Sequence, residues 1–184
     1  MSSETKFENA HLAVVIERVR TPTRERNWTT AHRKGAVVIA AITAQSKIVL
    51  INQERVPIRA SIWKMPAGQI DRPADEDGKE ARDVALRELR EETGYELAPG
   101  GELIALGDFF SSPGFTDEHE FLFAAKPVRR SSDGHAHAEN ETIHECREFS
   151  LAEIERMIAD NTIRDANTLS AWARLLARKI VIPT

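Results

Sequence analysis

Cysteine is nearly absent from this sequence, and so are long apolar runs. Cys146 is the single cysteine in 184 residues, which excludes an internal disulfide framework and suits a reducing cytoplasm. No apolar run approaches the roughly 20 residues of a membrane-spanning helix, and no apolar segment of a secretion signal follows the first charged residues. We therefore expect a cytoplasmic protein with no membrane partner.

Dense basic tracts and internal repeats are also lacking. Residues 1–65 hold 11 Lys and Arg against 5 Asp and Glu, whereas residues 66–184 hold 14 against 24, and the net charge is −4. The acidic second part argues against a nucleic acid partner. This split is consistent with a basic part that contacts phosphate and an acidic part that binds metal. Chance asymmetry produces such a split too.

Three carboxylates lie close together in the sequence, at Glu88, Glu91 and Glu92. A spacing of i, i+3 and i+4 places them on one face of a helix, where like charges repel. A hard cation such as Mg²⁺ relieves this repulsion, because it takes oxygen ligands and is often shared with phosphates. Gly94 is placed to end the helix, and Arg87 is placed to hold the neighbouring carboxylates.

This segment resembles the second half of the Nudix box, Arg-Glu-Leu-x-Glu-Glu-x-Gly followed by a hydrophobic residue. Upstream, Trp63 to Gly68 (Trp-Lys-Met-Pro-Ala-Gly) is similar to the strand and glycine loop that open the box. One position departs from the pattern, since Lys79 stands where the family has a first glutamate and residues 72–77 include an insertion. In the family that glutamate braces loop and helix, so the departure bears on local stability more than on chemistry.

The rest of the chain alternates strand and helix patterns. Strands are expected over 11–18, 26–32, 36–42, 48–51, 62–65, 103–110, 120–125 and 143–149, and helices over 80–92, 151–159 and 166–179. Residues 1–10 are expected to be frayed and 129–140 to form a polar loop. Ser150 and Glu153 form a capping box that starts a helix.

Helices on both faces of a sheet predict an α/β fold with three layers. That arrangement matches the Nudix fold, an α/β/α sandwich with a mixed β-sheet, preceded here by a small N-terminal β-strand segment. We expect residues 1–32 to form N-terminal strands for dimerisation and substrate binding, and residues 33–184 to form the Nudix hydrolase domain.

Other segments resemble the branch of the family that hydrolyses ADP-ribose and related nucleoside diphosphate sugars. The sequence Ser-Ser-Pro-Gly-Phe-Thr-Asp-Glu includes Pro113, Gly114 and Phe115, in a turn that the branch uses to line the sugar site. Arg55 follows Gln53-Glu54, similar to the branch's Gln-Tyr-Arg, and is expected to bind the diphosphate. Trp28 is a candidate for stacking on the nucleobase, with core packing as the alternative.

The resemblance implies a mechanism and a set of roles. Glu88, Glu91 and Glu92, with the carbonyl of Ala67, hold Mg²⁺, for which Mn²⁺ is expected to substitute. Arg87 orients the glutamates. Glu139 or Glu141, in a loop that resembles the late Glu-Asn-Glu of the branch, takes a proton from water, and Glu141 is also a candidate metal ligand. ADP-ribose then yields AMP and ribose 5-phosphate, and members of the branch are commonly homodimers.

Alternative functions stay open at this point. Another nucleoside diphosphate sugar, such as GDP-mannose, fits the same motifs. A diadenosine polyphosphate fits less well, because that branch tends to have tyrosine where Pro113 stands. A non-catalytic Nudix-like nucleotide sensor is the remaining rival, but such modules usually lose box glutamates and this chain keeps three.

Overall fold

Two β-sheets and three α-helices make up the chain in a computed structural model, which describes residues 2–70, 79–132 and 142–182. The strands are β1 (Ser3–Glu8), β2 (Leu12–Arg20), β3 (Glu25–Arg33), β4 (Ala36–Thr43), β5 (Ile48–Arg55), β6 (Ala60–Lys64), β7 (Ala67–Gln69), β8 (Tyr95–Phe110), β9 (His119–Arg130) and β10 (Ile143–Phe149). The helices are α1 (Lys79–Thr93), α2 (Leu151–Ala159) and α3 (Ala166–Ala177), with a short 3-10 turn η1 (Val56–Ile58).

The larger sheet has seven strands and is mixed. Its order is β10-β5-β4-β9-β8, with β6 paired to β5 and β7 paired to β4. The β4–β9 pair is parallel, and the other pairs of this sheet are antiparallel. This confirms the predicted α/β fold with a mixed sheet.

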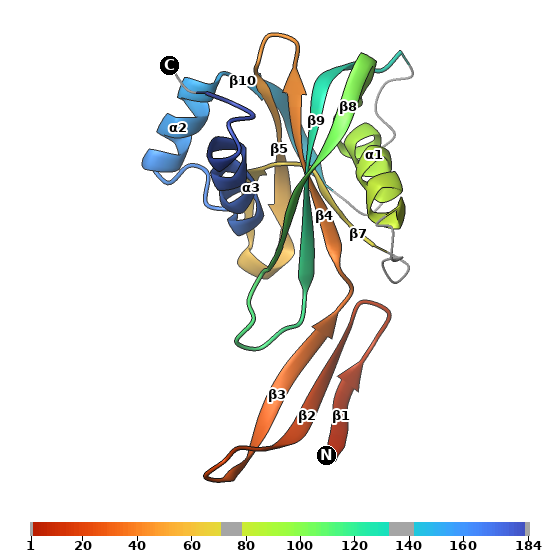
Figure 1. Cartoon of the computed structure of the whole chain (residues 1–184), viewed down its shortest axis with the longest axis vertical. Helices are drawn as coiled ribbons and strands as arrows, with labels where there is room; N and C mark the ends of the chain where they lie inside the picture. The colour runs from red at the N-terminus through yellow and green to blue at the C-terminus, as the bar shows by residue number, and fades with distance from the viewer. Residues whose placement is uncertain (1, 71–78, 133–141, 183–184) are drawn as a thin grey trace.

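Strand β4 contributes to the hydrophobic core on both faces of that sheet. Val38 and Ile42 pack in the core that includes α2 and α3, while Val37 and Ala41 pack in the core that includes α1. Side chains of a strand alternate between faces, so a continuous apolar run fits a strand covered on both sides. Figure 1 shows α1 on one side of the sheet and α2 with α3 on the other.

The helices start and pack as their sequences predict. Ser150 caps α2 with the predicted capping box, in which Ser150 N–H donates to Glu153 Oε2 at 2.8 Å. Trp172 and Leu175 of α3 are buried in the core. Within the described residues, no helix is long and apolar enough to cross a bilayer.

The first three strands form a separate antiparallel sheet, β1-β2-β3, which projects from the body in Figure 1. The expectation that residues 1–10 are frayed is wrong, because Ser3–Glu8 pairs with β2 from Ser3↔Glu17 onward. All six side chains of β1 are exposed, so backbone pairing holds this strand and its sequence carries no burial pattern. Residues 34–35 join β3 to β4.

Strands β8 and β9 are longer than expected. β8 begins at Tyr95 and not at residue 103, and β9 runs to Arg130, so the polar loop predicted from residue 129 begins later. The two strands pair as far as Tyr95↔Arg130, with register shifts at 97–102 and 105–107. Arg129 bonds Glu96 across them at 2.8 Å. Cross-strand hydrogen bonds and ion pairs extend a strand through polar residues that lack an apolar alternation.

Candidate active site

The three box carboxylates lie on the last turns of α1, which ends where the sequence indicated. Gly94 adopts φ +69°, a left-handed conformation that glycine enters without a Cβ clash, and its N–H bonds the carbonyl of Arg90 at 2.9 Å. Side-chain exposure falls from 36% at Glu91 to 14% at Glu88 and 3% at Glu92. The cluster therefore lies at the border between core and solvent, with Glu92 on the inner side.

Glu92 joins α1 to the segment between β6 and β7. Ala67 N–H donates to Glu92 Oε2 at 2.7 Å, and Lys64 Nζ lies 3.7 Å from Glu92 Oε1. Both side chains of this ion pair are about 95% buried or more, so the two charges compensate each other in a poorly solvated place. The pair fixes the last turns of the helix against the predicted metal-binding loop.

Glu88 packs directly on Gly68. A Cβ built at Gly68 would overlap Glu88 Cδ, well inside van der Waals contact, so only glycine leaves room for this carboxylate. Arg87 bonds Glu88 Oε1 at 2.9 Å and lies 3.7 Å from Glu91 Oε2. The arginine thus contacts two of the three box carboxylates, as its spacing predicted.

The carboxylate oxygens of this cluster suit a hard divalent cation as ligands. Glu88 and Glu92 both reach the Ala67–Gly68 backbone, and all of the side-chain donors are oxygens. No group of three His, Cys, Asp or Glu side chains meets around one point in residues 2–70, 79–132 and 142–182. Mg²⁺ is usually bound by one or two carboxylates, water and substrate phosphate, so two converging carboxylates meet its requirement.

A cavity of about 320 Å³ opens beside this cluster. Its charged side chains include three cations and three carboxylates: Arg33, Arg55, Lys64, Glu118, Glu120 and Asp165. Ala67 and Gly68 also line it, which connects the cavity to the carboxylates of α1. Cations beside an oxygen-ligand cluster suit a phosphorylated ligand.

Glu120 is a buried carboxyl in this cavity. Only 3% of the residue is exposed, and burial, reinforced by repulsion from Glu118, raises the pKa of Glu120 to about 7. A hydrogen bond from the Asn167 side chain opposes that rise. The sequence offered one signal for this residue, a glutamate within the apolar strand β9, and sequence reasoning overlooked it.

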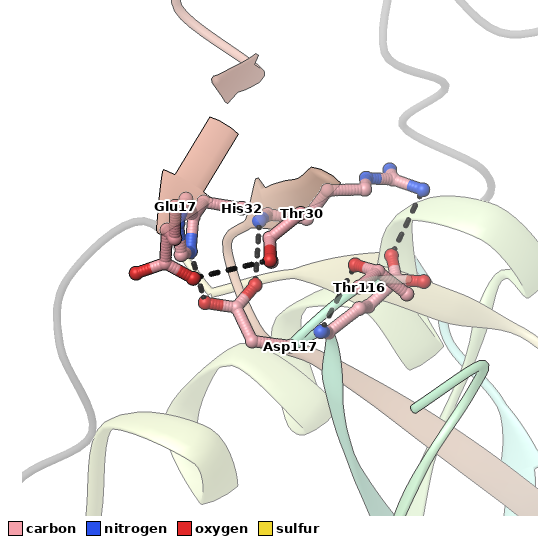
Figure 2. A network of polar contacts seen from close by, with 7 residues as sticks. Glu17, Thr30, His32, Thr116 and Asp117 are labelled. Atoms are coloured by element: carbon pink, nitrogen blue, oxygen red, sulfur yellow. Dashed lines mark hydrogen bonds and ion pairs between the residues drawn. The ribbon is translucent and has the colours of Figure 1, made fainter. Parts of the chain in front are cut away.

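The end of β3 is tied to the loop before β9, as Figure 2 shows for His32 and Asp117. His32 Nδ1 lies 2.7 Å from Asp117 Oδ2, and Arg33 N–H donates to Asp117 Oδ1 at 3.0 Å. Burial alone raises the pKa of Asp117, but the hydrogen bonds from His32 and Arg33 outweigh it and leave that pKa below its usual value.

The same contacts place the Arg33 side chain at the cavity. Arg33 bonds Glu118 Oε1 at 2.9 Å, and Ser111 Oγ donates to Glu118 Oε2 at 2.7 Å. Two residues before Arg33 in β3, Ala31 N–H bonds the carbonyl of Phe115 in the same loop at 2.7 Å. The projecting sheet therefore contributes a cation to the cavity through its junction with the loop.

The predicted site residues do not all meet in one place. Arg55 lines the cavity. In the described part of the chain the lining includes neither Trp28, whose ring lies 4.3 Å under the Arg26 guanidinium, nor the turn at Pro113, Gly114 and Phe115. Phe115 is 57% exposed.

Some predicted residues lie beyond the part of the chain that the structure describes. Glu139 and Glu141, proposed as base and metal ligand, lie outside the described residues, as does the insertion at 72–77. Sequence reasoning missed Arg33, Lys64, Glu120 and Asn167, which line the cavity. Lys64 stands out in the sequence as a lysine two residues before Pro66, but the sequence does not show that its partner is Glu92.

Comparison with known proteins gives the geometry a context. Residues 31–172 match the family model described as NUDIX domain. The chain is 38% identical over 137 residues to the methanol dehydrogenase activator of Bacillus methanolicus, covering 74% of this chain and 69% of that protein. It is 29% identical over 172 residues to the ADP-ribose pyrophosphatase of Bacillus subtilis (strain 168), covering 93% and 88%.

A solved structure of an ADP compounds hydrolase has the same fold. The TM-score is 0.78 at 19% sequence identity, and the match covers 98% of this chain and 91% of that one. It therefore includes the N-terminal sheet as well as the mixed sheet and its helices.

Proposed function

Because this chain belongs to the Nudix family of pyrophosphohydrolases, we propose that it hydrolyses the diphosphate bond of ADP-ribose, or of a related nucleoside diphosphate sugar. Water attacks one phosphorus and the bridging P–O bond breaks, so ADP-ribose yields AMP and ribose 5-phosphate. One observation carries the proposal: Glu88 and Glu92 converge on Ala67 and Gly68 at the edge of a cavity whose lining includes three cations.

A divalent cation, Mg²⁺ or in its place Mn²⁺, is part of the proposal. The residues that would hold it are Glu88, Glu91, Glu92 and the carbonyl of Ala67, whose oxygens suit either ion. When bound, such an ion neutralises charge developing on phosphorus and lowers the pKa of a bound water. Arg87 holds Glu88 and Glu91 through the contacts described above.

The cations of the cavity bind the diphosphate in this proposal. Arg55 and Arg33 face the same space from β5 and β3, and a guanidinium offers paired N–H donors that match phosphate oxygens. Lys64 serves the site through its ion pair with Glu92. Glu139 and Glu141 remain the predicted candidates for accepting the proton of the attacking water.

The roles assigned to Trp28 and to the turn at 113–115 also stay proposals. The nucleobase would stack on Trp28, and Pro113, Gly114 and Phe115 would approach the sugar. Both sites are partly open, with Phe115 more than half exposed, which is consistent with completion by a second copy of the chain. We propose a homodimer in which residues 1–32 contribute to assembly and residues 33–184 form the hydrolase domain; a monomer in sedimentation velocity at assay concentration rules it out.

Hydrolysis of a substrate panel with Mg²⁺ tests the function. The panel holds ADP-ribose, ADP-glucose, GDP-mannose, NADH and a diadenosine polyphosphate, with products separated by chromatography. We expect AMP and ribose 5-phosphate from ADP-ribose at the highest kcat/KM. A highest value for GDP-mannose moves the assignment to another sugar, and binding of ADP-ribose without turnover of any compound favours a sensor.

A variant of Glu88 separates catalysis from folding. Glu88→Gln removes one charge at Gly68 and leaves the buried Lys64–Glu92 pair intact, so we expect kcat to fall by orders of magnitude with thermal unfolding unchanged. Glu155→Gln, on the exposed face of α2, is the matched control and should keep full activity. Full activity of Glu88→Gln contradicts the proposed metal site.

The methanol dehydrogenase activator raises a second candidate, stimulation of a dehydrogenase. The 38% identity to that relative favours it. A rise in the turnover of a purified methanol dehydrogenase on adding this protein, lost in Glu88→Gln, would support it. No change in turnover would leave hydrolysis as the sole candidate.

A further inference from the structure

The carboxyl of Glu120 occupies a position where an apolar side chain would be more stable. It shares a face of β9 with Leu122 and Ala124, which pack in the core beneath α2 and α3. Burying a carboxyl without full hydrogen bonding costs free energy, and here the cost shows as a raised pKa. A buried polar group in a cavity, retained at such a cost, is a candidate for ligand binding.

The hydrogen bonds of Glu120 are incomplete. The Asn167 side chain supplies one bond, while Oε2 is buried and has no hydrogen-bond partner among the residues described. A carboxyl group accommodates several hydrogen bonds. Glu120 therefore has capacity for a ligand that donates to it or accepts from it.

The neighbouring carboxylates are already engaged. Glu118 bonds Arg33 and Ser111. Asp165 caps α3 by accepting from Thr168 N–H at 2.9 Å and from the Thr168 hydroxyl. Among these three carboxylates, only Glu120 has a buried oxygen without a hydrogen-bond partner in the described residues.

Charge is divided within the cavity, and this division indicates the chemical class of the ligand. The cations Arg33, Arg55 and Lys64 favour an anionic group, whereas the carboxylates Glu118, Glu120 and Asp165 repel one. A group that is neutral and bears hydroxyls suits the second part, because hydroxyls both donate to and accept from carboxyl and amide groups. A sugar joined to a diphosphate has this combination.

We propose that Glu120 and Asn167 together bind the hydroxyl groups of the terminal sugar, the one joined to the second phosphate of the substrate. This pair then selects nucleoside diphosphate sugars over nucleoside diphosphates that lack a terminal sugar. This inference rests on the proposed function. Asn167 is held for this role, because the adjacent Thr168 Oγ1 accepts from Met65 N–H at 2.9 Å and anchors the first turn of α3 at the end of β6.

The test compares two substrates in variants of Glu120. ADP-ribose carries the terminal sugar, and the β-methyl ester of ADP keeps the diphosphate diester but has a methyl group in place of that sugar. We expect Glu120→Leu to lower kcat/KM for ADP-ribose by about 10- to 100-fold, mainly through KM, because hydroxyls of the bound sugar then lack partners. The value for the methyl ester should stay unchanged, and Asn167→Ala should show the same pattern with a smaller effect.

Controls separate this role from a structural one. Glu120→Gln keeps the shape of the side chain and should lose less specificity than Glu120→Leu, while Glu102→Leu, at an exposed position of β8, should leave the ratio of the two substrates unchanged. Equal losses on both substrates, or none on either, overturn the proposed pair while the hydrolase assignment stands. Wild-type protein that cleaves no nucleoside diphosphate sugar overturns both proposals before any variant is made.

Discussion

The buried pair of Lys64 and Glu92 should dominate the stability of the catalytic edge. At the observed N···O separation of 3.7 Å, an effective dielectric constant of about 20 gives an attraction of about 4.5 kcal/mol. Removing one partner leaves the other charge buried, which typically costs about 3–5 kcal/mol. Because small domains are stable by only about 5–15 kcal/mol, Lys64→Met should lower the urea midpoint severely.

A double-mutant cycle measures the interaction directly. Lys64→Met, Glu92→Gln and the double variant are unfolded in urea with EDTA present, so that no divalent ion contributes. In the double variant both charges are gone and the amide oxygen of the new side chain at position 92 still accepts from Ala67 N–H, so part of the loss should be recovered. We expect a coupling energy of about 1–3 kcal/mol between the two sites.

An exposed pair provides the matched control. Arg129 and Glu96 lie 2.8 Å apart, with side chains 57% and 34% exposed, and such pairs couple by less than about 1 kcal/mol. The reasoning would be refuted if the unfolding free energy of Lys64→Met lay within about 0.5 kcal/mol of wild type. It would also be refuted if the coupling energy of the buried pair were no larger than that of the exposed pair. The same result would show that solvent reaches the pair.

Three further predictions concern single positions. Gly68→Ala should lower kcat/KM strongly while the circular dichroism spectrum persists, because the new Cβ displaces the Glu88 carboxylate; wild-type kinetics would contradict that packing. Asp117→Asn should destabilise the protein most near neutral pH. Because the folded pKa of Asp117 lies below its usual value, its contribution is present above the unfolded pKa of about 3.9 and is lost as pH falls through the folded value; a difference in urea midpoint that grows on acidification would contradict this. Ser150→Ala should cost about 1 kcal/mol through loss of the α2 cap, measured by thermal unfolding, and no change in midpoint would mean that the cap contributes nothing.

Local signals in the sequence predicted part of this architecture well. Helix α1 and its end at Gly94 follow from carboxylate spacing and from the conformational freedom of glycine. Helix α2 begins at its capping box, and β10 covers the residues expected for it. Each of these features is specified by residues that are close together in the chain.

Features that depend on distant partners were not predicted. Strand β1 has no buried side chain, so only its pairing with β2 identifies it. Glu120 and Asn167 become a pair only when α3 packs beneath β9, and Lys64 is informative only beside Glu92. A sequence shows that a charged residue lies in an apolar strand, but not which side chain compensates it.

The parallel pairing of β4 with β9 also bears on how the chain is made. Ala36 is in register with Glu120, so the central strand must wait for a partner that is synthesised seconds later at about 5–20 residues per second. Until then one edge of a strongly apolar strand is open on the nascent chain, and open edges invite pairing with other polypeptides. Production of this protein should therefore depend on chaperones that bind the chain at the ribosome until β9 emerges.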